Sequence, residues 1–342
     1  MADGPSAQMI ADIREAPEVV RRQEQALAQP INELVRRLRT KPPQVVVTAA
    51  RGSSAHAAAF AKHAIERYLG VPVAPAAPSI VTVYHRDLKL KGQLLLAISQ
   101  SGKSDDLVEQ MRSAKRAGAL TVALVNATDS PLAQASDIVV PLCAGPEQSV
   151  AATKTFVAAS AAVLRLTAAR AEDETLSNAL TRLPNRLAQA GELDWRVWSQ
   201  AVAEAQNLIV IGRGPTLSIA REAALKLKET CNLHAEAFSG AEFLHGPISL
   251  VTRKFPILMF LPGDAAAGAL IALARDLNRK HAALFIAGSG GGEGLPAVPA
   301  DQPETDAICA IQSFYATLPH LAKLRGLDAD RPRHLQKVTR TR

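Results

Sequence analysis

The sequence predicts an α/β protein built on mostly parallel β-sheets and made of two related halves. Short apolar runs rich in β-branched residues, such as QVVVTAA at 44–50 and LLLAIS at 94–99, alternate with stretches of helical periodicity. Such alternation is typical of βαβ units. A strand, a glycine turn and a long helix at 44–68 recur at 207–229, about 160 residues later. This spacing indicates a duplicated domain and not a short solenoid repeat.

The elements are expected in a simple order along the chain. Residues 6–38 read as helical pieces interrupted at Pro17 and Pro30, and Pro42 and Pro43 end that pattern. Expected strands of the first half lie at 44–50, 71–75, 94–99, 121–126 and 137–142, with helices at 55–70 and 107–118. The second half adds strands at 207–212, 256–263 and 282–288, a helix after the first and another between the last two.

The remaining segments are expected to connect or extend these halves. Residues 151–201 look largely helical, 287–300 (AGSGGGEGLPAVPA) read as a surface turn, and 326–342 read as an extended tail. The predicted division is a helical segment at 1–40, a first domain at 41–175, a second domain at 176–325, and a tail at 326–342 that carries Lys337.

Composition narrows the function classes. Hydrophobic residues make up 48% of the 342 residues, which excludes a disordered chain. The net charge of +7 (39 − 32) permits an anionic partner, although a solvated basic surface explains it equally well. The first 40 or so residues are too few for a helical DNA-reading domain, so no nucleic acid is expected.

Cysteine usage and the apolar runs bear on location. The three cysteines are odd in number and far apart, which argues against a disulfide framework. Neither a metal-ligand cluster nor a membrane-spanning run is visible. We therefore expect a cytoplasmic protein with no metal, no cofactor and no membrane contact.

The strongest local signal is Ser99-Gln100-Ser101-Gly102-Lys103-Ser104, which follows a predicted strand and opens a predicted helix. A helix N-terminus presents free N–H groups and the positive end of its dipole to an anion. Three hydroxyls and a glycine there suit a phosphate held by neutral donors, although the motif is not a Walker A loop. The alternative is that Ser104 merely caps the helix and the other serines are solvated.

Two other strand-to-helix turns have a similar character. In Gly52-Ser53-Ser54 the last serine either caps the following helix or contacts a ligand. The turn at 212–216 (GRGPT) is also capable of binding an anion, but its Pro215 is equally a favourable first residue of a helix.

Glu222, Lys226 and Glu229 are spaced i, i+4, i+7 and therefore share one helix face. The spacing alone favours a surface ion-pair stripe, and the alternative is a carboxylate base beside a lysine. His245, in FSGAEFLHGP, is expected at a loop tip, where a lone histidine is usually inert. Lys337 by itself indicates nothing.

Together these motifs resemble the sugar-isomerase (SIS) superfamily. The chain is similar to the isomerase half of glucosamine-6-phosphate synthase, and most similar to standalone glucosamine-6-phosphate deaminases of the SIS type. The matching stretches are SQSGKSDD (99–106), VAATKTF (150–156), EAALKLKETCNLHAEAF (222–238), AEFLHGPISL (241–250) and DADRPRHLQKVT (328–339). The resemblance implies two tandem SIS domains, each a flavodoxin-like three-layer α/β/α sandwich with a five-stranded parallel sheet. It also implies a homodimer whose active site takes a histidine from the neighbouring subunit.

The resemblance also implies roles for particular residues. The implied phosphate cradle is Ser99, Gln100, Ser101 and Ser104, and the implied sugar contacts are Ser54 and the backbone around Val150. The implied catalytic set is Glu229 as the carboxylate that moves a proton between C1 and C2, His245 in ring opening, Lys337 as an amine able to form a Schiff base, and Lys226 as a supporting charge.

Departures from the synthase pattern shape the expected reaction. The synthase carries an N-terminal glutaminase domain that this sequence lacks, so amination of fructose 6-phosphate is not expected. The reverse direction is a deamination of glucosamine 6-phosphate to fructose 6-phosphate and ammonia. Lys103 stands where the synthase has an acid, and Ala152 stands where it has a serine. The alternatives are a deaminase, isomerase or deglycase acting on another phosphorylated amino sugar, and a phosphosugar sensor without catalysis.

Overall fold

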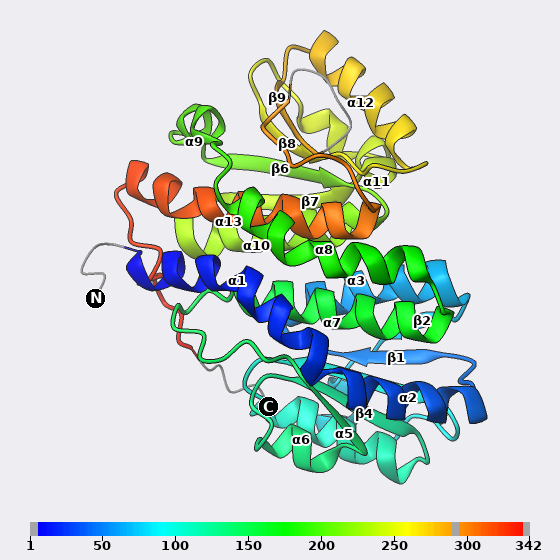
Figure 1. Ribbon diagram of the computed structural model, residues 1–342. Coiled ribbons are helices and arrows are strands. Elements are labelled where there is room, and N and C mark those ends of the chain that lie inside the picture. Colours follow the sequence, from blue (N-terminus) through cyan, green and yellow to red (C-terminus); the bar gives the residue numbers. More distant parts are fainter. Residues whose placement is uncertain (1–5, 289–293, 338–342) are drawn as a thin grey trace. The chain divides into compact units, whose positions relative to one another are not determined.

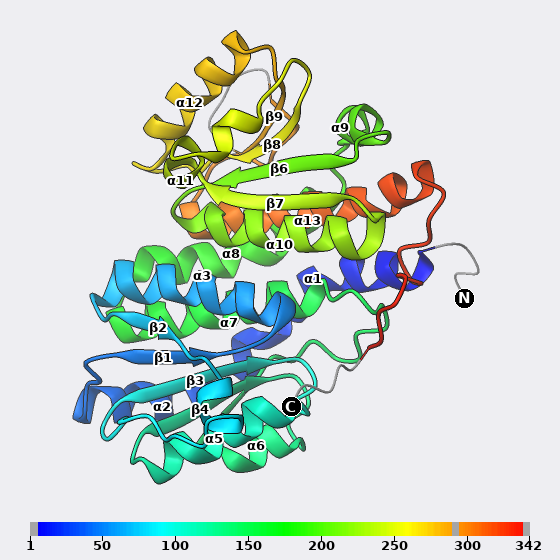
Figure 2. The same ribbon diagram turned by 180° about the vertical axis from the view of Figure 1, so that it is seen from behind.

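The computed structural model describes residues 6–288 and 294–337; the glycine-rich centre of the expected 287–300 turn and the last five tail residues lie outside this part. The chain forms two compact units (Figures 1 and 2). The first-sheet unit comprises 18–147, 154–181 and 336–342, and the second-sheet unit comprises 1–17, 148–153 and 182–335. Helices α1 (Ala7–Ala26) and α8 (Glu174–Gly191) each begin in one unit and end in the other.

The first-sheet unit holds a five-stranded parallel sheet in the order β2-β1-β3-β4-β5. Its strands are β1 (Val46–Ala49), β2 (Val73–Pro75), β3 (Leu94–Ser99), β4 (Leu120–Val125) and β5 (Ile138–Pro141). This is the flavodoxin-like strand order. The side on which successive strands are added to the sheet changes between β1 and β3. Ligands of such sheets bind beyond the carboxyl ends of the strands at that point, which is where the SQSGKS motif lies.

Helices cover both faces of the first sheet. They are α2 (Ala28–Thr40), α3 (Gly52–Leu69), α4 (Ser79–Thr82), α5 (Asp105–Arg116), α6 (Pro131–Ala135) and α7 (Lys154–Ala171). Figure 1 shows α3 and α7 on one face and α5 and α6 on the other. Every residue of β3 is buried, as the uninterrupted apolar run LLLAIS predicts for a central parallel strand.

The second-sheet unit holds a parallel sheet in the order β7-β6-β8-β9. Its strands are β6 (Asn207–Gly212), β7 (His234–Ser239), β8 (Pro256–Phe260) and β9 (Ala283–Ala287). Five strands were expected here; in the described residues the fifth position is marked only by a parallel bridge between Ala287 and Leu295. The α/β class with two parallel sheets is confirmed, and the second sheet follows the same topological order as the first.

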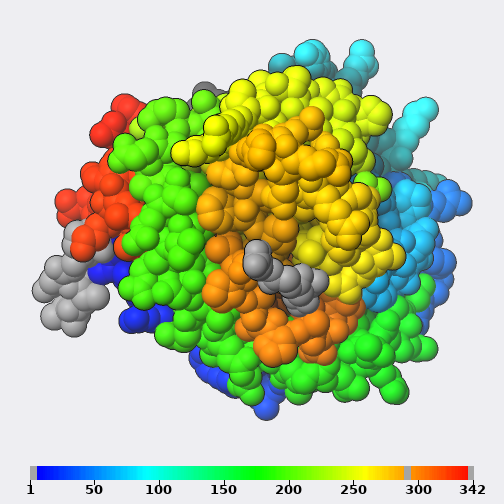
Figure 3. Space-filling view, turned by 90° about the horizontal axis from the view of Figure 1, so that it is seen from above, coloured from blue at the N-terminus to red at the C-terminus, as the bar shows by residue number. Residues whose placement is uncertain are grey.

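The helices of the second-sheet unit are α9 (Arg196–Val202), α10 (Pro215–Cys231), α11 (Gly240–Leu244), α12 (Ala267–Arg279) and α13 (Pro303–Leu324), with a 3₁₀ turn at Pro247–Leu250. Leucines of α12 pack on the apolar side chains of β6 and β8. The outer side of α12 forms part of the surface seen in Figure 3. Helices α10 and α13 pack against each other (Figure 1).

Two sequence expectations are wrong in detail. The segment FSGAEFLHGP is not a plain loop, because Phe238 and Ser239 end β7 and 240–244 form α11, with the Ser239 hydroxyl accepting from the N–H of Glu242. Pro17 does not interrupt the first helix. A proline lacks the N–H that would bond to the carbonyl four residues earlier. Here the Ile13 carbonyl accepts instead from the side-chain amide of Gln312 on α13, at 2.8 Å.

The two ends of the second-sheet unit are joined by hydrogen bonds. The backbone N–H groups of Gln8 and Met9, at the start of α1, donate to the Asp330 carboxylate at 2.8 Å each. The N–H of Ser6 donates to Asp328 at 2.8 Å, and the Ser6 hydroxyl accepts from the N–H of Ala329. Aspartates at a helix N-terminus satisfy free donors and complement the dipole. The beginning of the expected tail is therefore an anchored segment.

Candidate functional site

Residues 99–104 form a loop between β3 and α5 whose peptides are held in fixed orientations. The carbonyls of Ser99 and Gln100 accept from the N–H groups of Asn126 and Ala127, at 3.3 and 3.2 Å. Inside the loop, the Ser99 hydroxyl accepts from the N–H of Gly102 at 3.0 Å, and the Ser101 hydroxyl accepts from the N–H of Lys103 at 3.3 Å. These bonds hold the loop in one conformation ahead of the α5 N-terminus, and helix N-termini are the kind of place where anions bind.

Gly102 is the position in this loop that only glycine fits. Its φ of +61° is in the left-handed region. A Cβ atom there would lie 2.0 Å from the Ser130 hydroxyl oxygen. The Gly102 carbonyl also accepts from the N–H of Leu132 at 3.1 Å, so the loop is seated directly on the start of α6.

The simple capping alternatives for the two serines are not observed. Ser104 is the residue before α5, yet its hydroxyl makes no capping hydrogen bond. Ser54 is the third residue of α3, which begins at Gly52 after the uncapped Arg51, so Ser54 is not in the capping position. Ser104 directly precedes α5 and Ser54 lies in the first turn of α3, both beyond the carboxyl ends of strands of the first sheet, where ligands of such sheets bind.

An ion pair that the sequence analysis missed links these two turns. Asp106, only 2% exposed, accepts from the Arg51 guanidinium on one oxygen, at 2.9 Å to Nε and 2.5 Å to Nη2. Its other oxygen accepts from the N–H of Leu107 at 2.8 Å. Arg51 therefore neutralises a buried acid in the first turn of α5, which would otherwise repel an incoming anion.

The corresponding turn of the second-sheet unit is closed. The Thr216 hydroxyl is buried, donates to the Phe260 carbonyl at 2.7 Å and accepts from the N–H of Arg213 at 3.0 Å. Pro215 is the first residue of α10, which is the structural role that the sequence left open for it. The turn at 212–216 therefore starts a helix and offers no free hydroxyl.

Val150 belongs to a short segment, 148–153, that clusters with the second-sheet unit. The N–H groups of Gln148 and Ser149 donate to the buried Asp12 carboxylate at 2.9 and 2.8 Å, and the Ser149 hydroxyl donates to it at 2.9 Å. Asp12 lies on α1, 136 residues earlier in the chain. This clamp orients the backbone on the N-terminal side of Val150, and no sequence pattern indicated it.

The Glu222–Lys226–Glu229 face of α10 is buried, so the surface-stripe interpretation is wrong. Glu222 and Lys226 are 0% and 1% exposed, and Glu229 is 21% exposed. The Lys226 ammonium lies 2.5 Å from Oε2 of Glu229 and 3.5 Å from Oε1 of Glu222. One cation thus sits between two carboxylates, and only Glu229 is open to solvent. Helix α13 packs against α10, and the sequence analysis had assigned no helix to that segment.

Helix α13 also supplies a polar residue to this group. The hydroxyl of Tyr315, which is fully buried, donates to Oε1 of Glu222 at 3.0 Å. The sequence offered no signal for it, because Tyr315 is 93 residues away from Glu222 along the chain.

His245 and Glu229 lie near opposite ends of strand β7 in the second sheet. Glu229 is in the last turn of α10, next to the start of β7, whereas His245 follows α11, beyond the end of β7 (Figure 1). The six residues of β7 span roughly 17 Å. His245 is exposed. One chain therefore does not bring these two residues together.

The predicted residues are divided between the two units. Ser54, Ser99, Gln100, Ser101 and Ser104 belong to the first-sheet unit, while Val150, Lys226, Glu229 and His245 belong to the second. Lys337, exposed near the end of the described chain, clusters with the first-sheet unit. Within residues 6–288 and 294–337 there is no group of three His, Cys, Asp or Glu side chains placed to hold a metal ion. Across the same residues no helix is long and apolar enough to span a membrane.

Cys231, two residues after Glu229, is unsuited to act as a nucleophile. Burial raises the pKa of Cys231 to about 11 and the pKa of Cys309 to about 12. Both thiols therefore stay protonated near neutral pH, and they are unreactive because only thiolates are nucleophilic.

We expect a maleimide at pH 8 to label the partly exposed Cys143 alone among the three cysteines of the native protein, as counted by mass spectrometry. Labelling of Cys231 at a similar rate would contradict the burial described above.

Comparison with known proteins places the chain in a family. The profile of the SIS domain matches residues 40–169 and 201–292. The chain belongs to the SIS domain family. Among curated proteins, it is 32% identical over 305 residues to the glutamine–fructose-6-phosphate aminotransferase of Caulobacter vibrioides (84% of this chain, 50% of that protein). The Pseudomonas aeruginosa aminotransferase is 32% identical over 359 residues, with 96% and 58% covered. The chain thus spans about half the length of these relatives.

Solved structures show the same family relationship. A Silicibacter pomeroyi protein described as a candidate phosphosugar isomerase is 44% identical, with a TM-score of 0.90 over 94% of this chain and 99% of that one. The C-terminal domain of a Francisella tularensis glucosamine-fructose-6-phosphate aminotransferase is 26% identical, with a TM-score of 0.85 over 96% and 99%. A Thermotoga maritima glucosamine-6-phosphate deaminase, 20% identical with a TM-score of 0.73 over 96% and 100%, shares the fold.

Proposed function

We propose that this SIS protein isomerises a phosphorylated amino sugar, and that the reaction is the conversion of glucosamine 6-phosphate and water to fructose 6-phosphate and ammonia. The observation that carries the proposal is the Glu229 carboxylate, partly open to solvent and 2.5 Å from the buried Lys226 ammonium. A single carboxylate held in this way can take a proton from one carbon and return it to the next. The names of the related aminotransferases and of the Silicibacter pomeroyi protein point to the same class of substrate.

The proposed reaction assigns a step to each of the predicted residues. The phosphate binds at the Ser99–Ser104 loop, with Ser54 and the backbone near Val150 contacting the sugar. His245 assists opening of the ring. Glu229 removes the proton from C2 of the open-chain amino-aldose and delivers it to C1, while the C1 oxygen gains a proton and the C2 amine loses one, so that the aldehyde becomes an alcohol and the amine a ketimine. Water then adds to C2 and ammonia leaves, or Lys337 first displaces ammonia as a Schiff base that water hydrolyses.

The separation of His245 from Glu229 supports a shared active site. Because β7 separates these two residues by its full length, a histidine that acts on the same sugar as Glu229 has to come from a second copy of the chain. The proposed assembly is therefore a homodimer in which each site combines Glu229 of one subunit with His245 of the other. Mixing Glu229→Gln and His245→Ala chains tests this directly, because a dimer carrying both defects on different chains regains one intact site.

The first experiment supplies purified protein with glucosamine 6-phosphate, without glutamine, and measures ammonia and fructose 6-phosphate. Equimolar release of both is expected. A parallel reaction with fructose 6-phosphate and glutamine tests the synthetic direction. Saturable binding without product contradicts the proposed substrate. A panel of galactosamine 6-phosphate and fructosyl-amino-acid phosphates then separates another deaminase or deglycase from a phosphosugar sensor.

A further inference from the structure

We propose that Tyr315 is a positioning residue for the proton-transfer carboxylate, and that it acts through Glu222 and Lys226. The inference rests on the proposed role of Glu229. The contacts form an unbroken series: Tyr315 Oη donates to Glu222 Oε1 at 3.0 Å, Lys226 Nζ lies 3.5 Å from that same oxygen, and Lys226 Nζ lies 2.5 Å from Glu229 Oε2.

Burial makes each of these contacts consequential. Tyr315, Glu222 and Lys226 are at most 1% exposed, so water does not compete for their polar atoms. A buried carboxylate needs donors, because leaving it short of them is costly. The Tyr315 hydroxyl donates to Oε1 of Glu222, and the Lys226 ammonium forms an ion pair with the same oxygen. The hydroxyl thereby fixes where this oxygen lies, and the oxygen restrains Lys226 from the side opposite Glu229.

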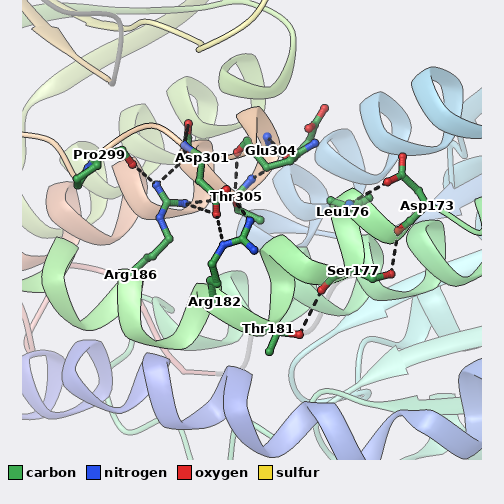
Figure 4. Close-up of polar contacts among 12 residues, drawn as sticks. Asp173, Leu176, Ser177, Thr181, Arg182, Arg186, Pro299, Asp301, Glu304 and Thr305 are labelled. Atoms are coloured by element: carbon green, nitrogen blue, oxygen red, sulfur yellow. Dashed lines mark hydrogen bonds and ion pairs between the residues drawn. The ribbon is translucent and has the colours of Figure 1, made fainter.

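Helix α13 is held by hydrogen bonds at both of its ends, which limits how far the Tyr315 hydroxyl can move. Arg182 and Arg186 extend from α8 to the start of α13 (Figure 4). Arg182 makes a two-pronged contact with Asp301, at 3.0 and 2.6 Å. Arg186 donates to the Pro299 carbonyl at 2.5 Å and to Asp306 at 2.7 Å. At the far end, Arg325 donates to the carbonyl of Cys231, the last residue of α10, at 2.6 Å.

The geometry also explains why a hydroxyl and not only a ring is needed at 315. The ring packs beside Phe314, with centroids 6.3 Å apart, and phenylalanine would preserve that contact. Only the hydroxyl reaches Glu222. Without it, Glu222 loses the donor that orients Oε1, and the position of the Lys226 ammonium relative to Glu229 is less tightly defined. Misplacement of a catalytic group lowers the rate of the chemical step more than substrate binding.

The test compares Tyr315→Phe with Tyr84→Phe, a matched loss of a hydroxyl from an exposed tyrosine. Tyr315→Phe is expected to lower kcat about tenfold with KM changed less than about twofold, since the lost bond serves a charged acceptor. Tyr84→Phe is expected to leave both parameters unchanged. In a Glu222→Gln background the Tyr315→Phe change is expected to have little further effect, because its action passes through that carboxylate.

A second readout does not depend on turnover. Acetylation of Lys226 by acetic anhydride, followed by mass spectrometry, reports how firmly the ammonium is held. We expect the modified fraction to rise severalfold in Tyr315→Phe and to stay at the wild-type value in Tyr84→Phe. If wild-type protein turns over no amino-sugar phosphate, the proposed function fails while this readout still tests the restraint. Unchanged kcat together with unchanged Lys226 acetylation in Tyr315→Phe overturns the inference, as does a loss confined to KM.

Discussion

Replacement of Glu229 by glutamine is expected to remove turnover and to leave phosphosugar binding nearly intact. The amide keeps the size of the carboxylate and can still contact Lys226, but it cannot accept and return a proton. General acid–base catalysis contributes about 10²- to 10⁴-fold, so kcat is expected to fall by at least about 10²-fold. Ammonia release measures the rate, and calorimetric titration with glucosamine 6-phosphate measures the affinity.

Glu204→Gln is the matched control, since Glu204 is an exposed glutamate of the same unit. It is expected to change neither rate nor affinity. Turnover within a few-fold of wild type in Glu229→Gln would remove Glu229 from the mechanism and with it the basis for a proton shuttle on α10. A variant that loses binding and turnover together would instead make Glu229 a substrate-binding group.

Gly102→Ala is expected to weaken both the fold of the first-sheet unit and its affinity for sugar phosphates. The new Cβ would lie 2.0 Å from the Ser130 hydroxyl oxygen and 2.6 Å from its Cβ, at a φ of +61°. Overpacking and a left-handed alanine together cost about 2–4 kcal/mol. Relief requires the loop to lift from α6, which breaks the Gly102–Leu132 hydrogen bond and misplaces the hydroxyls of Ser99 and Ser101. Denaturant unfolding and titration with glucosamine 6-phosphate measure the two effects.

Gly268→Ala provides the comparison, because Gly268 lies in α12 with nothing within 4 Å of the position a Cβ would take. Alanine in a helix is more favourable than glycine by about 0.5–1 kcal/mol, so this variant is expected to be slightly stabilised and to bind normally. Normal phosphosugar affinity in Gly102→Ala would separate this loop from the phosphate site.

The first sheet was predictable because its strands are buried on both faces and their sequences are continuous apolar runs. The apolar runs LLLAIS and TVALVN alternate with stretches of amphipathic helical pattern, which predicts that they are strands. Both form strands inside the sheet. Strand β7 (HAEAFS) was missed because it carries polar residues at an edge of its sheet, where only one neighbouring strand covers it. The other edge strands, β2, β5 and β9, have more apolar sequences and were predicted, so local pattern failed only at the polar edge strand among the described strands.

The candidate site was predictable only where its chemistry is local. The SQSGKS turn combines strand, glycine and serines in one segment, so its place at a helix N-terminus followed from adjacent residues. The burial of Glu222 and Lys226 did not, because spacing on α10 says nothing about which helix lies over it. That cover is α13, and its Tyr315 reaches Glu222 from 93 residues away. The Arg51–Asp106 and Asp12–Ser149 contacts were missed for the same reason, as each joins distant segments.

The hydrogen bonds between the start of α1 and Asp328 and Asp330 have a consequence for biosynthesis. Residues up to 322 positions apart have to meet before the first turn of α1 is satisfied. Translation proceeds from the N-terminus, so the opening helix leaves the ribosome long before its capping aspartates exist. Contacts of such long sequence separation form late and slow the final step of folding. The second-sheet unit, which needs α1 and Asp330 together, therefore reaches its complete structure only after Asp330 has left the ribosome.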